Sequence, residues 1–243
     1  MATMIWFHQR KDTWTRQIDV FIALTEFARE KYIQAGLPAD RIAVKPNFMN
    51  YPPEPSYENQ GYAIFLGRLT PEKGIKTLLT AWKKLTNVLL EILGDGVQRA
   101  ELEDIARRER LSNVEFLGFL PHAEAVQWLQ NACFLVLPSI VYESFPLTIR
   151  EAFACGKPVV ASRLGAMAAI IEDGKTGLLF EPGNPDDLAA KVCQMMENED
   201  AVIKMGKAAR AEFEAKYTAE RNHEMLMEIY EMAIRVHQEV KLR

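Results

Sequence analysis

The chain has 243 residues, and its 29 Lys and Arg against 33 Asp and Glu give a formal net charge of −4. This balance lacks the basic excess that binding to a phosphate backbone needs, so no nucleic-acid partner is expected. Hydrophobic residues make up 49% and charged residues 26%, which is the composition of a globular protein with a sizeable core. No run approaches the ~18 consecutive apolar residues of a membrane span. We therefore expect no transmembrane segment and a cytoplasmic location, with peripheral attachment at the inner face of a membrane left open.

The first 50 residues contain one helix-like stretch, a strand at 20–24, a helix at about 26–35 and a strand at 41–45. These elements are too few to close a hydrophobic core by themselves. We interpret residues 1–50 as the remnant of a second domain, with an N-terminal extension that packs on the main domain as the alternative. Residues 51–61 have three prolines and no apolar period, which predicts a linker.

From residue 62 onward, short apolar runs alternate with helical patterns. The runs lie at 63–66, 88–93, 114–117, 133–137, 158–161 and 178–180. Such runs predict strands buried on both faces, whereas Ile75, Leu78 and Trp82 have the spacing of an amphipathic helix. The alternation predicts a Rossmann-like α/β fold, a doubly wound parallel sheet with right-handed crossovers. We expect the main domain to span 62–217 and a C-terminal helix to span 218–243.

The loop after the first of these runs, Gly67–Gly74, carries Arg68 and Lys73 between its glycines. Ligands bind at the carboxyl ends of the strands in an open parallel sheet. Fixed cations beside helix N-terminal amides suit a diphosphate there, and a solvated basic turn is the alternative.

The loop after the next run, Gly94–Ala100, is glycine-rich. Turns of this kind serve nucleotide binding and plain tight turns about equally. Together with Glu115, which we place at the end of the following strand, the loop imitates a dinucleotide-binding fingerprint. An NAD(P)-binding oxidoreductase domain therefore stays open as an alternative function.

Pro146 predicts the start of a helix after the run at 133–137. The amides of Leu147 and Thr148 are then unpaired first-turn donors, with Glu143 before the helix and Glu151 inside it. Carboxylates repel phosphate but accept sugar or ribose hydroxyls, so this pair indicates the neutral parts of one ligand, unless both are surface charges. Eight residues of helix span ~12 Å, against ~5–9.5 Å between glycoside hydrolase carboxylates, which disfavours hydrolysis.

The other reactive side chains predict neither a disulfide nor a metal site. Cys133, Cys155 and Cys193 stand in apolar contexts and are expected to be reduced core residues. The four histidines, His8, His122, His223 and His237, lack partners at metal-ligand spacing and are expected on the surface. No D-x-D triplet occurs near a strand end, so we expect no metal and no other cofactor.

As a group, these motifs resemble in order and spacing the donor-binding half of the group 1 glycosyl transferases, a retaining family that includes glycogen synthase-like enzymes and lipopolysaccharide mannosyl- and glucosyltransferases. The motifs are Gly67-Arg68, Glu72-Lys73-Gly74, Gly94-Asp95-Gly96, Phe116-Leu117-Gly118, Glu143 with Glu151, Ala154–Ala161 and Asp173–Leu179. The resemblance covers about residues 20–220. It implies the C-terminal half of a B-type glycosyltransferase fold, with residues 19–49 as the last units of the N-terminal acceptor domain.

The resemblance further implies a hexosyltransferase that moves a sugar from a UDP-, GDP- or ADP-sugar to a saccharide or lipid-linked acceptor, with retention and without metal. It implies catalytic roles for Arg68 and Lys73 at the diphosphate and for Glu143 at the sugar, with Glu151 at the ribose. The implied donor-binding residues are Gly67, Arg68, Lys73, Gly94, Gly118, Phe119, Glu143, Ser144, Phe145, Leu147, Thr148 and Glu151. The chain alone is then an incomplete enzyme, expected to bind the donor and to transfer no sugar.

Two further points qualify this interpretation. Ala169 stands where members of the family frequently carry a glutamate, in a Gly-Gly-x-x-Glu segment that is Gly165-Ala166-Met167-Ala168-Ala169 here. A module that binds nucleotide-sugar without transferring it is the main alternative function.

Overall fold

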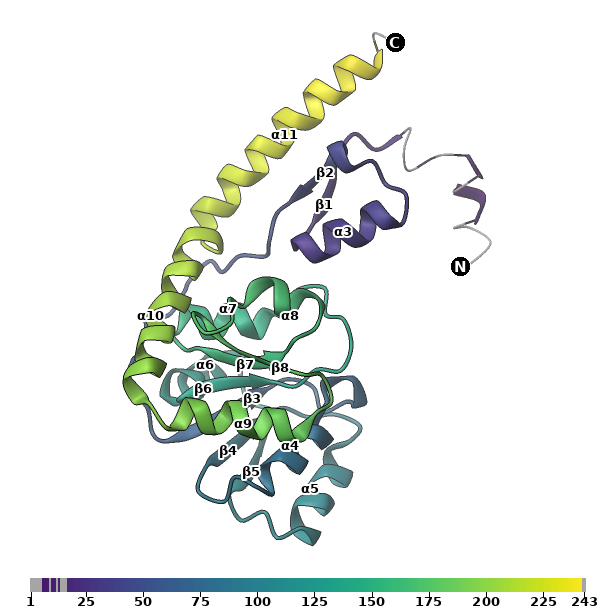
Figure 1. The fold of residues 1–243 in the computed structure, drawn as a ribbon. Helices are drawn as coiled ribbons and strands as arrows, with labels where there is room; N and C mark the ends of the chain where they lie inside the picture. Colours follow the sequence, from purple (N-terminus) through teal and green to yellow (C-terminus); the bar gives the residue numbers. More distant parts are fainter. Residues whose placement is uncertain (1–5, 9, 12, 14–16, 242–243) are drawn as a thin grey trace.

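The computed structural model describes residues 6–8, 10–11, 13 and 17–241. Its centre is a six-stranded parallel sheet with the strand order β5-β4-β3-β6-β7-β8 (Figure 1). The strands are β3 (Tyr62–Leu66), β4 (Leu89–Leu93), β5 (Val114–Gly118), β6 (Phe134–Leu137), β7 (Val159–Ser162) and β8 (Gly177–Phe180). Counted from β3, this is the 3-2-1-4-5-6 order of the doubly wound fold, and the direction of winding reverses between β3 and β6. The predicted fold class is confirmed.

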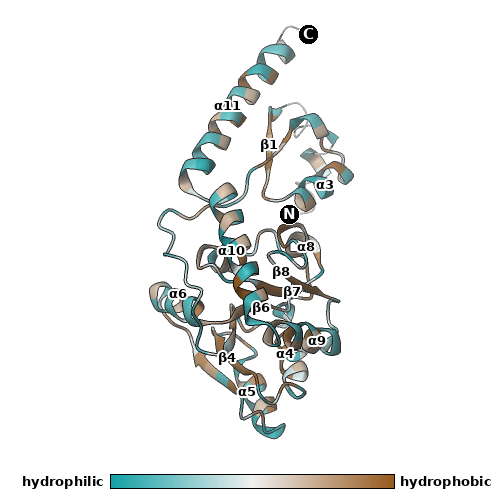
Figure 2. Cartoon of the chain, turned by 60° about the vertical axis from the view of Figure 1, so that its left-hand side comes forward, coloured by the Kyte–Doolittle hydropathy of each residue, from teal (hydrophilic) through white to brown (hydrophobic). Residues whose placement is uncertain are grey.

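Helices cover both faces of this sheet. One face packs against α4 (Ile75–Trp82), α5 (Arg99–Arg108) and α9 (Pro185–Met196), the other against α6 (His122–Asn131), α7 (Leu147–Ala154) and α10 (Glu199–Lys216). The short helix α8 (Gly165–Ile170) follows β7 on the side of α7 (Figure 1). The central strands β6 and β7 are mainly apolar in Figure 2, as expected of strands buried on both faces.

Local chemistry explains the starts of two helices. The side chain of Asn184 accepts hydrogen bonds from the amides of Asp186 and Asp187, and Pro185 occupies the first helical position of α9. The helix α7 begins directly after Pro146. Gly156 follows the last turn of α7, and its φ of +72° is one that residues with a side chain rarely adopt. This glycine therefore helps to end the helix.

The N-terminal segment forms a separate parallel pair, β1 (Phe21–Ala23) and β2 (Ile42–Val44), with α3 (Glu26–Gln34) and the 3-10 turn η1 (Ala39–Arg41) between them. This pair is not hydrogen-bonded to the six-stranded sheet among the described residues. Instead α3 packs on α8, so the segment lies over the carboxyl edge of the sheet.

Residues 51–61 form neither helix nor strand and connect the two parts of the chain. They are held along the larger part by hydrogen bonds from Lys157 Nζ to the carbonyl of Glu58 (2.7 Å) and from Arg210 Nη1 to the carbonyl of Pro53 (2.9 Å). The amide of Ser56 also donates to the carbonyl of Cys155 at 3.0 Å. This proline-rich segment is therefore a fixed strap rather than a free spacer.

The chain returns to the N-terminal segment through α11 (Ala219–Lys241), which extends beyond the sheet (Figure 1). Asn222 connects the two: Lys45 Nζ donates to its Oδ1 at 3.1 Å, and its Nδ2 donates to the carbonyl of Pro46 at 3.0 Å. Where the strap begins, the amide of Met49 donates to the carbonyl of Tyr217 at 3.0 Å. The chain thus passes between its two parts twice, near Met49 and near Tyr217, and these two points lie side by side.

Candidate functional site

Glycines bring three loops together at the carboxyl edge of the sheet, beside the point where its winding reverses. Gly94 has a φ of +142°, and a Cβ there would lie 1.8 Å from the carbonyl oxygen of Gly67. Its amide donates to the carbonyl of Gly118 at 2.8 Å. A Cβ on Gly96 would lie 2.4 Å from the carbonyl oxygen of Leu69. The glycine-rich turn after β4 thus exists because the loops after β3, β4 and β5 approach backbone to backbone.

The loop after β6 also joins this cluster, through its contact with Gly74. Gly74 lies between the 3-10 turn η2 (Pro71–Lys73) and α4. Gly74 has a φ of +70°, and a Cβ there would lie 2.0 Å from the carbonyl oxygen of Pro138. This close approach sets the loop that carries Lys73 against the loop that follows β6.

Lys73 and Glu143 meet at this junction although 70 residues separate them. Lys73 Nζ lies 2.6 Å from Glu143 Oε1, and Ser139 Oγ donates to the same oxygen at 2.7 Å. The two side chains are only 17% and 16% exposed. A largely desolvated, hydrogen-bonded cation and carboxylate are therefore held in fixed positions at the switch point.

Arg68 behaves differently from Lys73. Its side chain is 77% exposed, and its one ion pair among the described residues is a long contact of 3.9 Å with Glu72. With Gly67, Gly94 and Phe119 it lines a cavity of ≈ 360 Å³ whose other walls are mainly apolar. A free guanidinium at the mouth of an apolar cavity can pair with an anionic ligand.

Glu151 lies behind the same cavity. Its side chain is 10% exposed, and its Oε1 lies 3.4 Å from His122 Nε2 and 3.8 Å from Arg150 Nη2. Burial raises the pKa of Glu151, and the charges of His122 and Arg150 oppose that rise. His122 also lines the cavity with Arg68. Sequence reasoning placed this histidine on the surface, and although its side chain is 70% exposed, it contacts a predicted site residue.

The remaining predicted site residues fall into two groups. Leu147 and Thr148 form the first turn of α7, and Ser144 is exposed beside Glu143. Phe145, in contrast, is buried and packs edge-on against Tyr217 with ring centroids 5.9 Å apart. Phe145 therefore does not line the cavity of Arg68, among the residues described.

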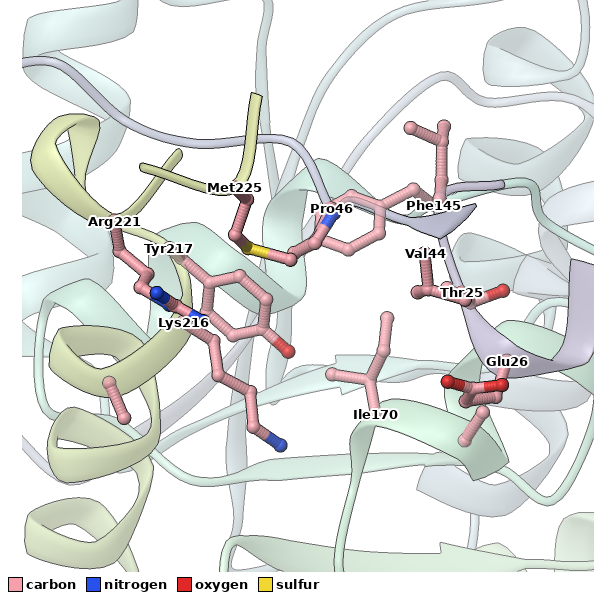
Figure 3. A pocket seen from close by; sticks show the side chains of 13 residues that line it. Thr25, Glu26, Val44, Pro46, Phe145, Ile170, Lys216, Tyr217, Arg221 and Met225 are labelled. Atoms are coloured by element: carbon pink, nitrogen blue, oxygen red, sulfur yellow. The ribbon is translucent and has the colours of Figure 1, made fainter. Parts of the chain in front are cut away.

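A second cavity of ≈ 440 Å³ separates the N-terminal segment from the larger part of the chain (Figure 3). Thr25 and Val44 line one side, Ile170 the other, and Tyr217 stands at the helical end with its hydroxyl directed towards Ile170. Ala169, the position where the family frequently has a glutamate, also lines this cavity.

Two sequence interpretations are corrected here. Glu115 is the second residue of the edge strand β5 and lies opposite Glu91, the middle residue of β4, not at the carboxyl end where a ribose would lie. The dinucleotide fingerprint is therefore incomplete. Cys193 is exposed, whereas Cys133 and Cys155 are buried as expected.

In the described part of the chain, no three His, Cys, Asp or Glu side chains gather in a way that could hold a metal ion. Over the same residues, none of the helices combines the length and the apolar character that crossing a bilayer requires.

The fold and these loops define an α/β domain of the Rossmann type with a ligand cleft at the topological switch point. The chain belongs to the family described as glycosyl transferases group 1, whose model matches residues 50–212. The predicted family is thereby confirmed.

Relatives of known sequence agree with this membership. An uncharacterized glycosyltransferase of Methanocaldococcus jannaschii is 32% identical over 170 residues, which cover 70% of this chain and 48% of that protein. Glycogen synthase of Mycobacterium tuberculosis is 36% identical over 152 residues, covering 60% of this chain and 36% of the enzyme. The chain thus spans half or less of the length of these relatives.

Solved structures show the same fold. The Anabaena protein HepE in complex with UDP and glucose matches with a TM-score of 0.77 and 25% identity, over 88% of this chain and 63% of HepE. Staphylococcus aureus TarM, in a complex that includes UDP, matches with a TM-score of 0.76 and 26% identity, over 88% of this chain and 44% of TarM.

Proposed function

We propose that the cleft at the switch point binds the donor of a glycosyl transfer, a nucleoside diphosphate sugar. Arg68 and Lys73 bind the diphosphate, Glu143 accepts hydroxyls of the sugar, and Glu151 accepts hydroxyls of the ribose. The base lies in the cavity beside Phe119. Family membership supports the class of reaction, and the UDP in the HepE and TarM structures supports the class of ligand.

In the whole protein, the donor transfers its sugar to a hydroxyl of a saccharide or lipid-linked acceptor, with retention at the anomeric carbon. The bond from that carbon to the β-phosphate oxygen breaks, and a bond to the acceptor oxygen forms. The acceptor proton passes to the released diphosphate or to solvent. Negative charge grows on the departing phosphate, and fixed cations with helix N-terminal amides stabilise it more in the transition state than in the ground state.

One observation carries this proposal: the Lys73–Glu143 pair at 2.6 Å, held by Ser139 at the edge of the sheet. A cation for phosphate and a carboxylate for hydroxyls stand side by side, which matches a ligand that is charged at its diphosphate and neutral at the adjoining sugar. A site that bound phosphate alone would gain nothing from the carboxylate of Glu143, which repels an anion.

The substitution Lys73→Ala tests the proposal. We expect the affinity for UDP, GDP or ADP, whichever binds best, to fall by about 1.5–3 kcal/mol, the worth of a charged hydrogen bond. Titration calorimetry measures the loss, and the same titration in EDTA should leave the wild-type affinity unchanged, since we propose that binding needs no metal.

Lys84→Ala is the matched control, because Lys84 is exposed, pairs with Asp186 at 2.7 Å and lies before β4, away from the carboxyl edge. The Lys84→Ala variant should bind the nucleoside diphosphate as tightly as the wild type does. Equal affinity of the Lys73 variant and the wild type would contradict the phosphate role of Lys73.

A further inference from the structure

The two oxygens of Glu151 have different surroundings. Oε1 faces two nitrogen groups, His122 Nε2 at 3.4 Å and Arg150 Nη2 at 3.8 Å. Among the described residues, Oε2 accepts no hydrogen bond and is not sealed from solvent. One oxygen is thus held by the protein, while the other remains available to a ligand.

His122 is placed to act on both the carboxylate and the ligand. It is the first residue of α6, directly after Pro121, so its backbone position is fixed by the start of a helix. Its ring contacts Glu151 and also lines the ≈ 360 Å³ cavity. Most of the ring remains in solvent, on the side open to a ligand.

The charged groups around this ring come from four places. Glu151 and Arg150 face it from α7, Arg68 and Asp95 line the same cavity from the loops after β3 and β4, and Glu124 lies on its own helix. Asp95 is already bonded to Arg99 Nη1 at 3.0 Å. Glu151 is therefore the carboxylate that the ring of His122 contacts directly.

We propose that His122 is a positioning residue for donor binding: its ring nitrogen Nε2, as a donor to Oε1, holds the carboxylate of Glu151 turned so that Oε2 accepts the hydroxyls of the ribose. This inference rests on the proposed function, since it needs a ribose beside Glu151. Hydrogen bonds to an ionised carboxylate are stronger than those between neutral groups. The contribution of the ribose hydroxyls to affinity then depends on the contact between His122 and Glu151.

Protonation of Glu151 limits this arrangement at low pH. As the pH falls, Glu151 takes up a proton at a higher pH than an exposed glutamate does, because burial raises its pKa. A protonated carboxyl is a weaker acceptor than a carboxylate, so the ribose contribution falls on the acid side.

The experiment compares a nucleoside diphosphate with its 2′,3′-dideoxy analogue by calorimetry at pH 7.5 and at pH 5. Both ligands carry the same phosphates, so the ratio of their dissociation constants isolates the ribose hydroxyls. We expect the wild-type ratio to fall towards pH 5, and His122→Ala to lower the ratio at pH 7.5 about three- to tenfold. His122→Gln keeps an N–H donor and should restore part of the ratio, whereas in Glu151→Gln the ratio should stay near one at both pH values.

Glu124→Gln, on the exposed first turn of the same helix, should keep the wild-type ratio. A ratio in His122→Ala equal to that of the wild type overturns the role of His122. A wild type that binds the nucleotide without discriminating the dideoxy form overturns this inference alone. A wild type that binds no nucleoside diphosphate overturns the proposed function as well.

Discussion

Lys157 is a lysine with almost no access to solvent, at 2% exposure, and it sits under the proline-rich strap. Its Nζ donates to the carbonyl of Glu58 at 2.7 Å, and no carboxylate forms an ion pair with it among the described residues. Burial lowers the pKa of Lys157 to about 8. The side chain holds the strap in place, but the folded state disfavours its charge.

This lowered pKa predicts an unusual dependence of stability on pH. Between about pH 8 and the ordinary lysine value of 10.5, the unfolded chain keeps a proton on Lys157 that the folded chain has lost. The free energy of unfolding should therefore rise with pH in this window, by about 3 kcal/mol from this residue, and the penalty is fully present below pH 8. Urea unfolding from pH 7.5 to 10.5 measures it.

Lys157→Met isolates the effect, because other lysines and tyrosines titrate in the same window. The free energy of unfolding of the wild type, relative to that of this variant, should increase with pH. The difference between the wild type and Lys84→Met, a change at an exposed lysine, should stay constant with pH. A constant difference between wild type and Lys157→Met across the window would refute the burial argument.

Single residues show where sequence reasoning reaches its limit. The exposure of Cys193 was predictable, because it lies outside the stripe of Leu188, Val192 and Met195 that faces the sheet. The contact of His122 with Glu151 was not, since 29 residues and the strand β6 separate them and no local pattern encodes the packing of α6 beside α7.

At the scale of elements, the loop junction at Gly74 gives a sharp test. Gly74→Ala forces a side chain into a φ of +70° and against the carbonyl oxygen of Pro138. We expect a loss of about 2–4 kcal/mol in unfolding free energy. Nucleotide affinity should fall as well, because Lys73 is the preceding residue. Urea unfolding and calorimetry measure the two effects.

Gly174→Ala is the control for backbone strain. Gly174 has a similar φ of +79°, but no heavy atom lies within 4 Å of its added Cβ. This variant should lose only about 1–2 kcal/mol, with nucleotide affinity intact. Equal losses in the two variants would show that the approach of Gly74 to Pro138 does not matter.

Elements that depend on local pattern were predictable, and their mutual placement was less so. The run at 133–137 became β6 (Phe134–Leu137) because a strand covered on both faces must be apolar throughout. The same logic cannot show that residues 51–61 are hydrogen-bonded to the larger part of the chain, because a segment without hydrophobic periodicity does not indicate which residues it contacts. Likewise, Lys73 and Glu143 were both predicted for the site, but their bond to each other depends on tertiary structure.

At the scale of the whole molecule, Asn222 is the polar contact between α11 and the segment that leaves β2. It is 6% exposed and bonds to both Lys45 and Pro46. Asn222→Ala leaves two partners unsatisfied and should cost about 1–3 kcal/mol. Hydrogen exchange should speed up in α11 and in the β1–β2 pair, with the six-stranded sheet unaffected.

Glu231→Ala, an exposed change on the same helix, should leave exchange as in the wild type. Faster exchange throughout the sheet of the Asn222 variant would mean that the two parts of the chain unfold as one unit, contrary to this prediction.

The adjacency of Met49 and Tyr217 has a mechanical consequence. Two parts joined by one flexible chain segment can rotate about any axis. Two joining segments that are hydrogen-bonded to each other restrict the rotation to one axis. Rotation about the line through those residues would stretch neither crossing, and it would change the distance from α3 to the loop of Glu143. Opening to admit a ligand and closing over it would then be a swing along one path, guided by backbone rather than by side chains.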